Sequence, residues 1–333
     1  MKKILSILAL ALAAFALTAC SATAPKAQAG IDDDGQDIRI FTVSNEDGKI
    51  TAATIEAAFE KTGFAIDGNN NMNAPFKPRF GKTFYQTYHL FTTHSASHTL
   101  ALAKKYPKIG LLSPLSMSLY SNRDDDTSKG KTMSISSLTL RGMSRITQIP
   151  MNNPDLIAYS KFLEKGLRAA LPGGHFRTLS YKNIAKMEVS YETTFTTEFD
   201  GADIDERSEQ KDDFEAEFEG ELEPIGFLFP GFVDFASEFG DAGFDGYEQY
   251  DTYSICKLDV IFPIHQKHPE VGAFAPCTYY IYMKKGEKTV HMGFPSIENW
   301  VSATDLDPAD KETFGTLYEA QGLIESVVNE IIE

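Results

Sequence analysis

The sequence predicts an α+β protein of two tandem two-layer domains, each an antiparallel sheet with helices packed on one face. The first observation is a repeat: Lys105–Ser116 (KYPKIGLLSPLS) returns 162 residues later as Lys267–Thr278 (KHPEVGAFAPCT). Solenoid repeats run about 20–50 residues, so a period this long indicates two copies of one domain. The second observation is that strand patterns follow one another as hairpins, with helices only before and after them, which is typical of antiparallel α+β folds.

The first half of the chain has strand, helix and turn signals in a simple order. We expect a strand at 38–43, a helix ending at Gly63-Phe64, a strand near Thr83–Thr93, a hairpin of Leu115–Tyr120 with Thr132–Leu138, and a closing helix. The closing helix starts at Asn153-Pro154, an N-cap residue followed by proline at the first helical position. These elements assign residues 37–172 to the first domain and 173–183 to a linker.

The second half, residues 184–333, repeats this order. We expect a strand at 187–199, a helix at 214–225, a strand at Tyr247–Ile255, a hairpin of Cys277–Met283 with Lys288–Met292, and a closing helix from Asp307-Pro308. The segment 214–225 is ambiguous, because its apolar residues alternate with glutamates and also fit helical spacing. The matching helix of the first half, which also ends in Gly-Phe, decides in favour of a helix.

Residues 1–20 predict an export signal with a lipid anchor. Lys2 and Lys3 precede an apolar run that is too short to span a bilayer, and Leu17-Thr18-Ala19-Cys20 resembles the lipobox of bacterial lipoproteins. We therefore expect lipidation at Cys20, a tether over 21–36, and a cell-envelope protein held by its lipid anchor to the membrane. Ser21 favours the outer membrane, facing the periplasm. The alternative is an ordinary secretory signal with an incidental cysteine.

The charge of the chain excludes some partners. The formal net charge is −16, and thirteen acidic residues crowd 198–223 against only two basic ones. A chain this acidic is repelled by nucleic acid and by anionic lipid headgroups, so nucleic acid is not expected as a partner.

The cysteines of the second half carry a family resemblance. Cys256 and Cys277 are 21 residues apart, with Pro269-Glu270-Val271-Gly272 between them and Pro276 before the second cysteine. This pattern resembles the bacterial family named domain of unknown function 302, over roughly residues 184–333. The chain departs from it at Cys256-Lys257-Leu258, where the family has Cys-Asn-Pro, and at Ala275, where it has Leu. The resemblance implies a two-layer α+β fold and brings no established activity.

The first half is similar to a diverged copy of the same family, because His94 stands in the place of Cys256 and Leu115 in the place of Cys277. His94 and His98 lie four residues apart, and we expect them to be surface or capping residues rather than a metal site.

Cys256 and Cys277 allow three interpretations. A disulfide is favoured, since the expected compartment oxidises thiols and neighbouring antiparallel strands allow the bond. Two buried, unreactive thiols are the second interpretation. The third is a reactive pair or a metal site, which His265, His268 and His291 could complete, although the spacing matches no standard zinc pattern.

The segment Gly226–Phe244 is unusually rich in phenylalanine, with Phe227, Phe229, Phe232, Phe235, Phe239 and Phe244. A core strand with a packed loop is the favoured interpretation, and a mobile aromatic lid over an apolar ligand pocket is the alternative. The sequence has no nucleophile elbow, phosphate-binding loop or convincing catalytic triad, and no cofactor is expected. The leading hypothesis is therefore a non-catalytic binding module for a small apolar ligand or a protein partner. The competing one is a thiol/disulfide redox or metal-handling protein that uses the cysteine pair.

Overall fold

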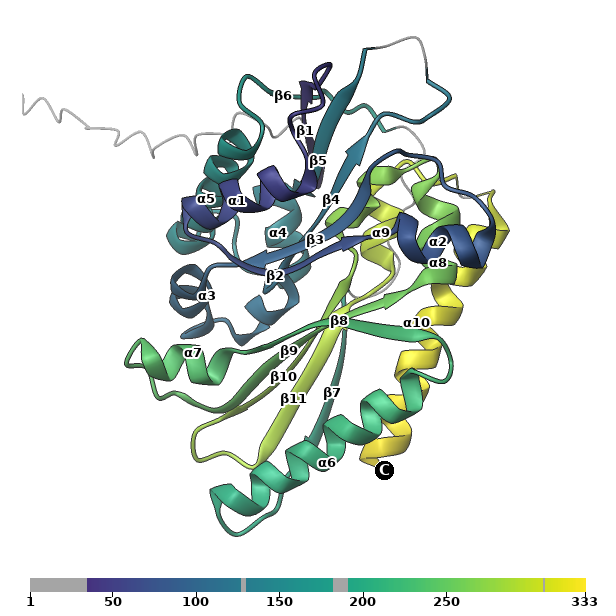
Figure 1. Ribbon diagram of the computed structural model, residues 1–333. Helices are drawn as coiled ribbons and strands as arrows, with labels where there is room; N and C mark the ends of the chain where they lie inside the picture. Colours follow the sequence, from purple (N-terminus) through teal and green to yellow (C-terminus); the bar gives the residue numbers. More distant parts are fainter. Residues whose placement is uncertain (1–34, 127–129, 182–190, 308) are drawn as a thin grey trace, which may run out of the picture.

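The computed structural model describes residues 35–126, 130–181, 191–307 and 309–333. The signal, the lipidation site Cys20, nearly all of the tether and the start of the strand expected at 187–199 lie outside these ranges. The described chain forms two antiparallel sheets, of six and five strands, with helices packed against them (Figure 1). The predicted α+β class is confirmed.

The first half contains one sheet, with strand order β2-β3-β4-β5-β1-β6. Its elements are β1 (Ile38–Ser44), α1 (Ala52–Thr62), β2 (Ala65–Asn71), α2 (Asn73–Phe80), β3 (Tyr88–His94), α3 (Ala96–Ala103), the 3-10 helix η1 (Pro107–Leu112), β4 (Leu115–Ser121), β5 (Thr132–Leu138), α4 (Leu140–Thr147), α5 (Pro154–Ala170) and β6 (His175–Phe176).

The second half contains the other sheet, with strand order β7-β11-β10-β9-β8. Its elements are β7 (Glu192–Glu198), α6 (Ile204–Leu222), β8 (Phe227–Asp234), α7 (Phe235–Asp241), β9 (Tyr247–Lys257), α8 (Leu258–His265), the 3-10 helix η2 (Pro269–Ala273), β10 (Cys277–Lys284), β11 (Thr289–Pro295), α9 (Glu298–Ala303) and α10 (Lys311–Ile332). Apart from β6, the two halves share one order of elements and one order of strands, as a duplicated unit requires.

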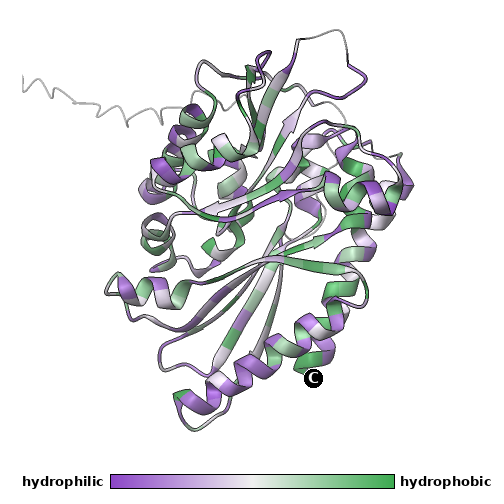
Figure 2. Cartoon of the chain, in the orientation of Figure 1, coloured by the Kyte–Doolittle hydropathy of each residue, from purple (hydrophilic) through white to green (hydrophobic). Residues whose placement is uncertain are grey.

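Long amphipathic helices cover the outer face of each sheet. α1 and α5 bury Phe59 and Leu163 against the first sheet, and α6 and α10 bury Phe218 and Leu317 against the second. The solvent side of α6 is strongly hydrophilic (Figure 2). Helix α1 ends where Gly63 takes a left-handed conformation (φ 108°), which glycine adopts without steric cost.

The repeated segment of the sequence forms the contact between the two halves. η1 of the first half packs on β10, and η2 of the second half packs on β4. The hydrogen bonds exchange in the same way: Ser116 Oγ donates to the Pro276 carbonyl (2.7 Å), and Thr278 Oγ1 donates to the Pro114 carbonyl (3.2 Å). These two hydrogen bonds are counterparts 162 residues apart, so the halves pack here with approximate two-fold symmetry.

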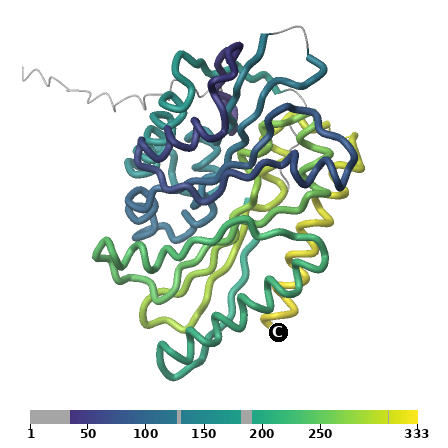
Figure 3. The backbone as a smooth tube through the Cα atoms, viewed as in Figure 1, coloured from purple at the N-terminus to yellow at the C-terminus, as the bar shows by residue number. Residues whose placement is uncertain are grey.

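Two short helices also cross between the halves. α2 of the first half lies beside α8, where the Phe80 and Phe262 rings stack with centroids 3.9 Å apart, and α7 of the second half packs on α3 (Figure 3). These are equivalent elements of the two copies, so the approximate two-fold symmetry extends to the edge of the interface.

Several local predictions were incomplete or wrong. Strand β2 and helices α2, α4, α7 and α9 were not expected, and residues 175–176 of the expected linker pair with β1 as the edge strand β6. The last helix does not start at Asp307-Pro308; its N-cap is Asp310, whose carboxylate accepts from the Thr313 amide (3.1 Å).

Candidate functional site

An apolar cavity of about 60 Å³ lies in the second half, between the helix-covered face of the sheet and helices α8, α9 and α10. Both Cys256 and Cys277 line it, because Cys256 lies one residue before the end of β9 and Cys277 begins β10, and these strands are paired. Aliphatic and aromatic groups form most of the remaining wall, among them Phe227, Ile255, Ile261, Phe294, Trp300 and Ile324. A cavity of this size holds about two water-sized groups, and an apolar lining disfavours water.

The two cysteines are free thiols in the structure, so the disulfide that the sequence favoured is not formed. Cys256 is buried, and the Cys277 thiol donates to the Phe274 carbonyl (3.4 Å). Burial raises the pKa of each thiol to about 12. Thiolate is the reactive form of cysteine, so both groups are poor nucleophiles and poor metal ligands near neutral pH.

Of the six phenylalanines proposed as pocket residues, Phe227 lines this cavity. The segment forms strand β8 and helix α7, and its other rings point elsewhere. Phe229 packs on Tyr253, and Phe232 is half exposed (49%). The remaining three, Phe235, Phe239 and Phe244, pack in an aromatic cluster with Tyr247 and Tyr250. The structure therefore has a strand and a helix where the lid interpretation required a loop.

The histidines proposed to complete a metal site do not line the cavity. His265 is buried with Nδ1 2.6 Å from the Phe262 carbonyl oxygen, His268 Nδ1 lies 3.3 Å from Glu270 Oε1, and His291 stacks on Tyr282. Across the described residues, no group of three or more His, Cys, Asp or Glu side chains could hold a metal ion.

His94 was expected to be a surface or capping residue and is instead buried at the contact between the halves (3% exposed). Its Nδ1 lies 2.8 Å from Asp67 on β2, and its Nε2 lies 3.0 Å from Glu238 on α7. Carboxylates accept but do not donate, so both ring nitrogens carry protons and the ring is an imidazolium. Burial lowers the pKa of His94, but the two hydrogen-bonded carboxylates outweigh it and raise the pKa to about 9. His98, on α3, contacts the side chain of the N-cap residue of that helix, with Nδ1 2.8 Å from Ser95 Oγ.

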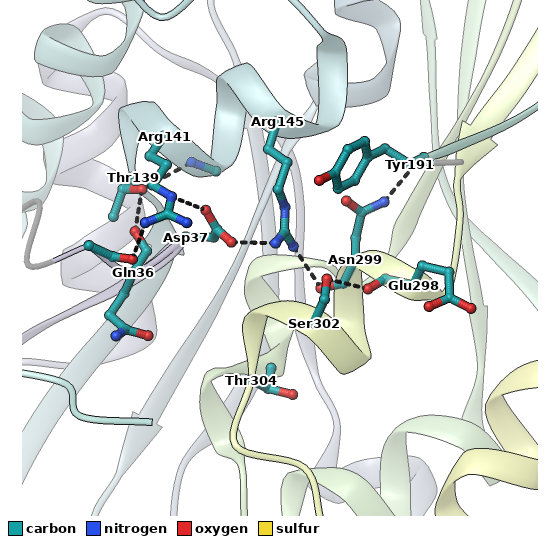
Figure 4. Close-up of polar contacts among 12 residues, drawn as sticks. Gln36, Asp37, Thr139, Arg141, Arg145, Tyr191, Glu298, Asn299, Ser302 and Thr304 are labelled. Carbon is teal, nitrogen blue, oxygen red and sulfur yellow. Dashed lines mark hydrogen bonds and ion pairs between the residues drawn. The ribbon is translucent and has the colours of Figure 1, made fainter. Parts of the chain in front are cut away.

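A second group of polar contacts, an ion pair and two hydrogen bonds, joins the halves where α4 meets α9 (Figure 4). Arg145 on α4 pairs with Asp37, the residue before β1, at 2.6 Å and donates to the Asn299 carbonyl at 3.3 Å. Asn299 in turn donates from Nδ2 to the carbonyl of Tyr191, the residue before β7 (2.6 Å). These side chains fix the halves relative to each other. Because their partners are more than 100 residues apart, no local sequence signal identifies them.

This chain matches no protein family by sequence and resembles one solved structure in part of its chain. No protein-family model matches the chain, and no curated protein matches it. One solved structure, that of the uncharacterized conserved protein DUF302 from Bacillus stearothermophilus, is structurally similar over 44% of this chain and 100% of that one, with 17% sequence identity and a TM-score of 0.34. Membership of that family stays a prediction. In the described residues, no helix is both long enough and apolar enough to cross a bilayer.

Proposed function

We propose that this protein is a non-catalytic binding module that holds a small apolar group in the cavity beside Cys277 and Trp300. The observation that carries the proposal is the cavity itself: it lies between sheet and helices, and its wall is almost entirely apolar. Protein interiors are normally close-packed, so a void with such a lining is a natural place for an apolar ligand. Its volume of about 60 Å³ fits a small molecule or the end of an alkyl chain.

The polar groups of the cavity refine the choice of ligand. Trp300 is 2% exposed, and its indole Nε1 lacks an oxygen or nitrogen partner and has only the Cys277 sulfur, a weak acceptor, for its N–H. This N–H can donate to an acceptor atom of a bound molecule. Lys257 is the one charged residue of the lining, and its Nζ donates to the Ile225 carbonyl. We therefore expect an apolar ligand with an acceptor oxygen, such as an alcohol, to bind better than a hydrocarbon of the same size.

The competing proposal is thiol chemistry at the cysteine pair, since both thiols share one cavity. It is the weaker of the two, because burial raises both pKa values to about 12 and the described residues supply no metal site. Titration of thiols in the presence and absence of mild reductant separates the two. A pair that cycles between thiol and disulfide would favour the redox protein.

The location of the protein is also a proposal, supported by the sequence alone. Lipidation at Cys20 would hold the described body to a membrane of the cell envelope by a short tether, most simply the outer membrane facing the periplasm. In a Cys20→Ser variant, we expect the protein to move from the membrane fraction to the soluble fraction. Retention in the membrane fraction would contradict the anchor.

Trp300 makes ligand binding directly measurable, because it is the sole tryptophan of the chain. Titration with methanol, whose two heavy atoms match a cavity of about 60 Å³, should change the emission of Trp300 in a saturable way. Cys277→Leu places in the second half the residue that the first half carries at Leu115, and the larger side chain should fill the cavity and abolish the response. Phe232→Ala is the control, because Phe232 does not line the cavity. An unsaturable response, or equal binding by Cys277→Leu, would refute the proposal.

A further inference from the structure

A second and larger cleft, of about 760 Å³, lies beside the N-terminal part of α6 and is distinct from the apolar cavity. The start of β9, the beginning of α7 and the turn between β10 and β11 form its other walls. The helix-side face of β9 is polar here, with Gln249 and Asp251, and becomes apolar further on, at Ile255. One strand thus contributes to both the cleft and the apolar cavity.

The first half has a cleft of about 710 Å³ at the equivalent place. Gln86, Thr87, His89 and Arg123 line it, and they stand 162 residues before Glu248, Gln249, Asp251 and Lys285 of the second cleft. The position of the cleft is therefore a property of the duplicated unit. Its chemistry has diverged: where the first copy has His89, the second has a buried carboxylate.

Two buried acceptor oxygens in the second cleft lack donors. Asp251 is 1% exposed, and its Oδ2 accepts from Lys211 Nζ at 2.8 Å, while its Oδ1 has no partner. Gln249 is 5% exposed, and its Nε2 donates to the Arg207 carbonyl at 3.2 Å, while its Oε1 has no partner. The two residues are two apart on one strand, so their side chains share a face. Buried polar atoms in folded proteins are nearly always hydrogen-bonded, so a bound molecule with N–H or O–H groups would satisfy Asp251 Oδ1 and Gln249 Oε1.

The basic side chains of the cleft donate to other oxygens and not to these two. Arg207 Nε lies 2.7 Å from Glu248 Oε1, Lys211 pairs with Asp251, and Lys285 pairs with Asp245. Asp212 and Asp234 add two further negative charges to the lining, so acids outnumber bases. A bare metal ion is a poor occupant, since no metal-holding group occurs in the described parts of the chain.

We propose that this cleft binds a primary ammonium compound whose N–H groups donate to Asp251 Oδ1 and Gln249 Oε1. An ammonium group offers three donors and a positive charge, which match the two orphan acceptors and the acidic lining. The cleft, of about 760 Å³, has room for an aliphatic amine rather than an ammonium ion alone. The site does not depend on the apolar cavity or on what that cavity binds.

The test uses 1,4-diaminobutane as the probe, with binding followed by calorimetry and by amide chemical shifts. We expect saturable binding with a Kd below about 1 mM. Tetramethylammonium carries the charge without any N–H donor and should not compete. No binding, or equal competition by tetramethylammonium, would overturn the proposal even before any variant is made.

Variants locate the site. Gln249→Leu removes one orphan acceptor without changing a charge and should weaken diamine binding about tenfold, the usual effect of losing a hydrogen bond to a charged group. Thr87→Val, at the equivalent position of the first-half cleft, is the matched control and should leave the affinity unchanged. Asp251→Asn should weaken binding further. Thermal unfolding of each variant shows that it folds, and unchanged affinity in folded Gln249→Leu would contradict the assignment.

Discussion

The charged His94 makes a prediction about pH that can be worked through from its two contacts. Its ring bridges Asp67 of the first half and Glu238 of the second, and both carboxylates hold the imidazolium form. The pKa of about 9 in the folded chain exceeds the value of about 6.5 in an unfolded chain, and a difference of about 2.5 corresponds to about 3 kcal/mol of stabilisation. Because the pKa is raised on folding, this stability is fully present below about pH 6.5 and is lost as the pH rises through 9.

The substitution His94→Gln removes the titrating imidazole and keeps a side-chain amide that can still donate a hydrogen bond. Urea unfolding at a series of pH values, followed by Trp300 emission, gives the free energy of unfolding of both proteins. Between about pH 6 and pH 9.5, the wild type should lose about 3 kcal/mol more than the variant does. His98→Gln, at the nearby histidine on α3, is the control and should follow the wild-type curve.

Two results would refute this reasoning. Parallel pH curves for wild type and His94→Gln would show that the charge on His94 does not stabilise the fold. A His94 pKa at or below 6.5, measured by NMR titration of its ring protons, would show that the carboxylates do not outweigh burial.

Three further changes test the interface and the cavity. Gly272→Ala should lower the free energy of unfolding by about 1–3 kcal/mol, because an added Cβ would lie 2.4 Å from the Ser118 Cβ of the other half. Gly220→Ala is the control, because an added Cβ there has no atom within 4 Å, and it should not destabilise the protein. Equal effects of the two substitutions would contradict the close packing at Gly272. Arg145→Met should cost about 1.5–3 kcal/mol in the same urea assay, because it removes one of the two cations that pair with the buried Asp37 and leaves Arg141 in place. A near-zero change would show that Arg145 does not stabilise the contact between the halves. Because burial raises their pKa values to about 12, Cys256 and Cys277 should react slowly with a disulfide reagent at about pH 8 in the folded protein and readily in urea. Peptide mass spectrometry measures the labelling of each cysteine, and rapid labelling in the folded protein would contradict their burial.

The architecture could be predicted because the sequence contains an internal repeat of about half its length. The repeated Pro-x-x-Gly segment identified the duplication, and the structure adds the reason for the similarity: each copy of the segment must fit the sheet of the other half. Gly110 shows this, since a Cβ there would meet Tyr280 Cβ at 2.7 Å. The ambiguous glutamate-rich segment was also assigned correctly as helix α6, by comparison with α1.

The elements that sequence reasoning missed are held by tertiary contacts. Strand β2 (Ala65–Asn71) is polar and lacks an apolar alternation, and it forms because it pairs with β3. Helix α2 is only eight residues long and contains Pro78, so local propensity opposes it, and Phe76 anchors it between the halves.

The candidate sites also depend partly on residues that the sequence indicated and partly on tertiary contacts that it did not. An apolar pocket was only the alternative interpretation of the phenylalanine-rich segment, and of its six phenylalanines Phe227 lines the cavity. Its most useful residue, Trp300, lies on the unexpected helix α9. The charge of His94 depends on Asp67 and Glu238, which are 27 and 144 residues away. The cleft beside α6 depends on which acceptors stay unpaired in the folded chain. Neither the charge of His94 nor the cleft beside α6 could be predicted from neighbouring residues in the sequence.

The most direct test of the central claim is a crystal structure determined under xenon pressure, since apolar cavities take up xenon. We expect xenon density in the second half, enclosed by Cys277, Trp300 and Ile324, and no such density when Cys277→Leu crystals are treated in the same way. Wild-type crystals in which side chains or ordered water fill that space would contradict it.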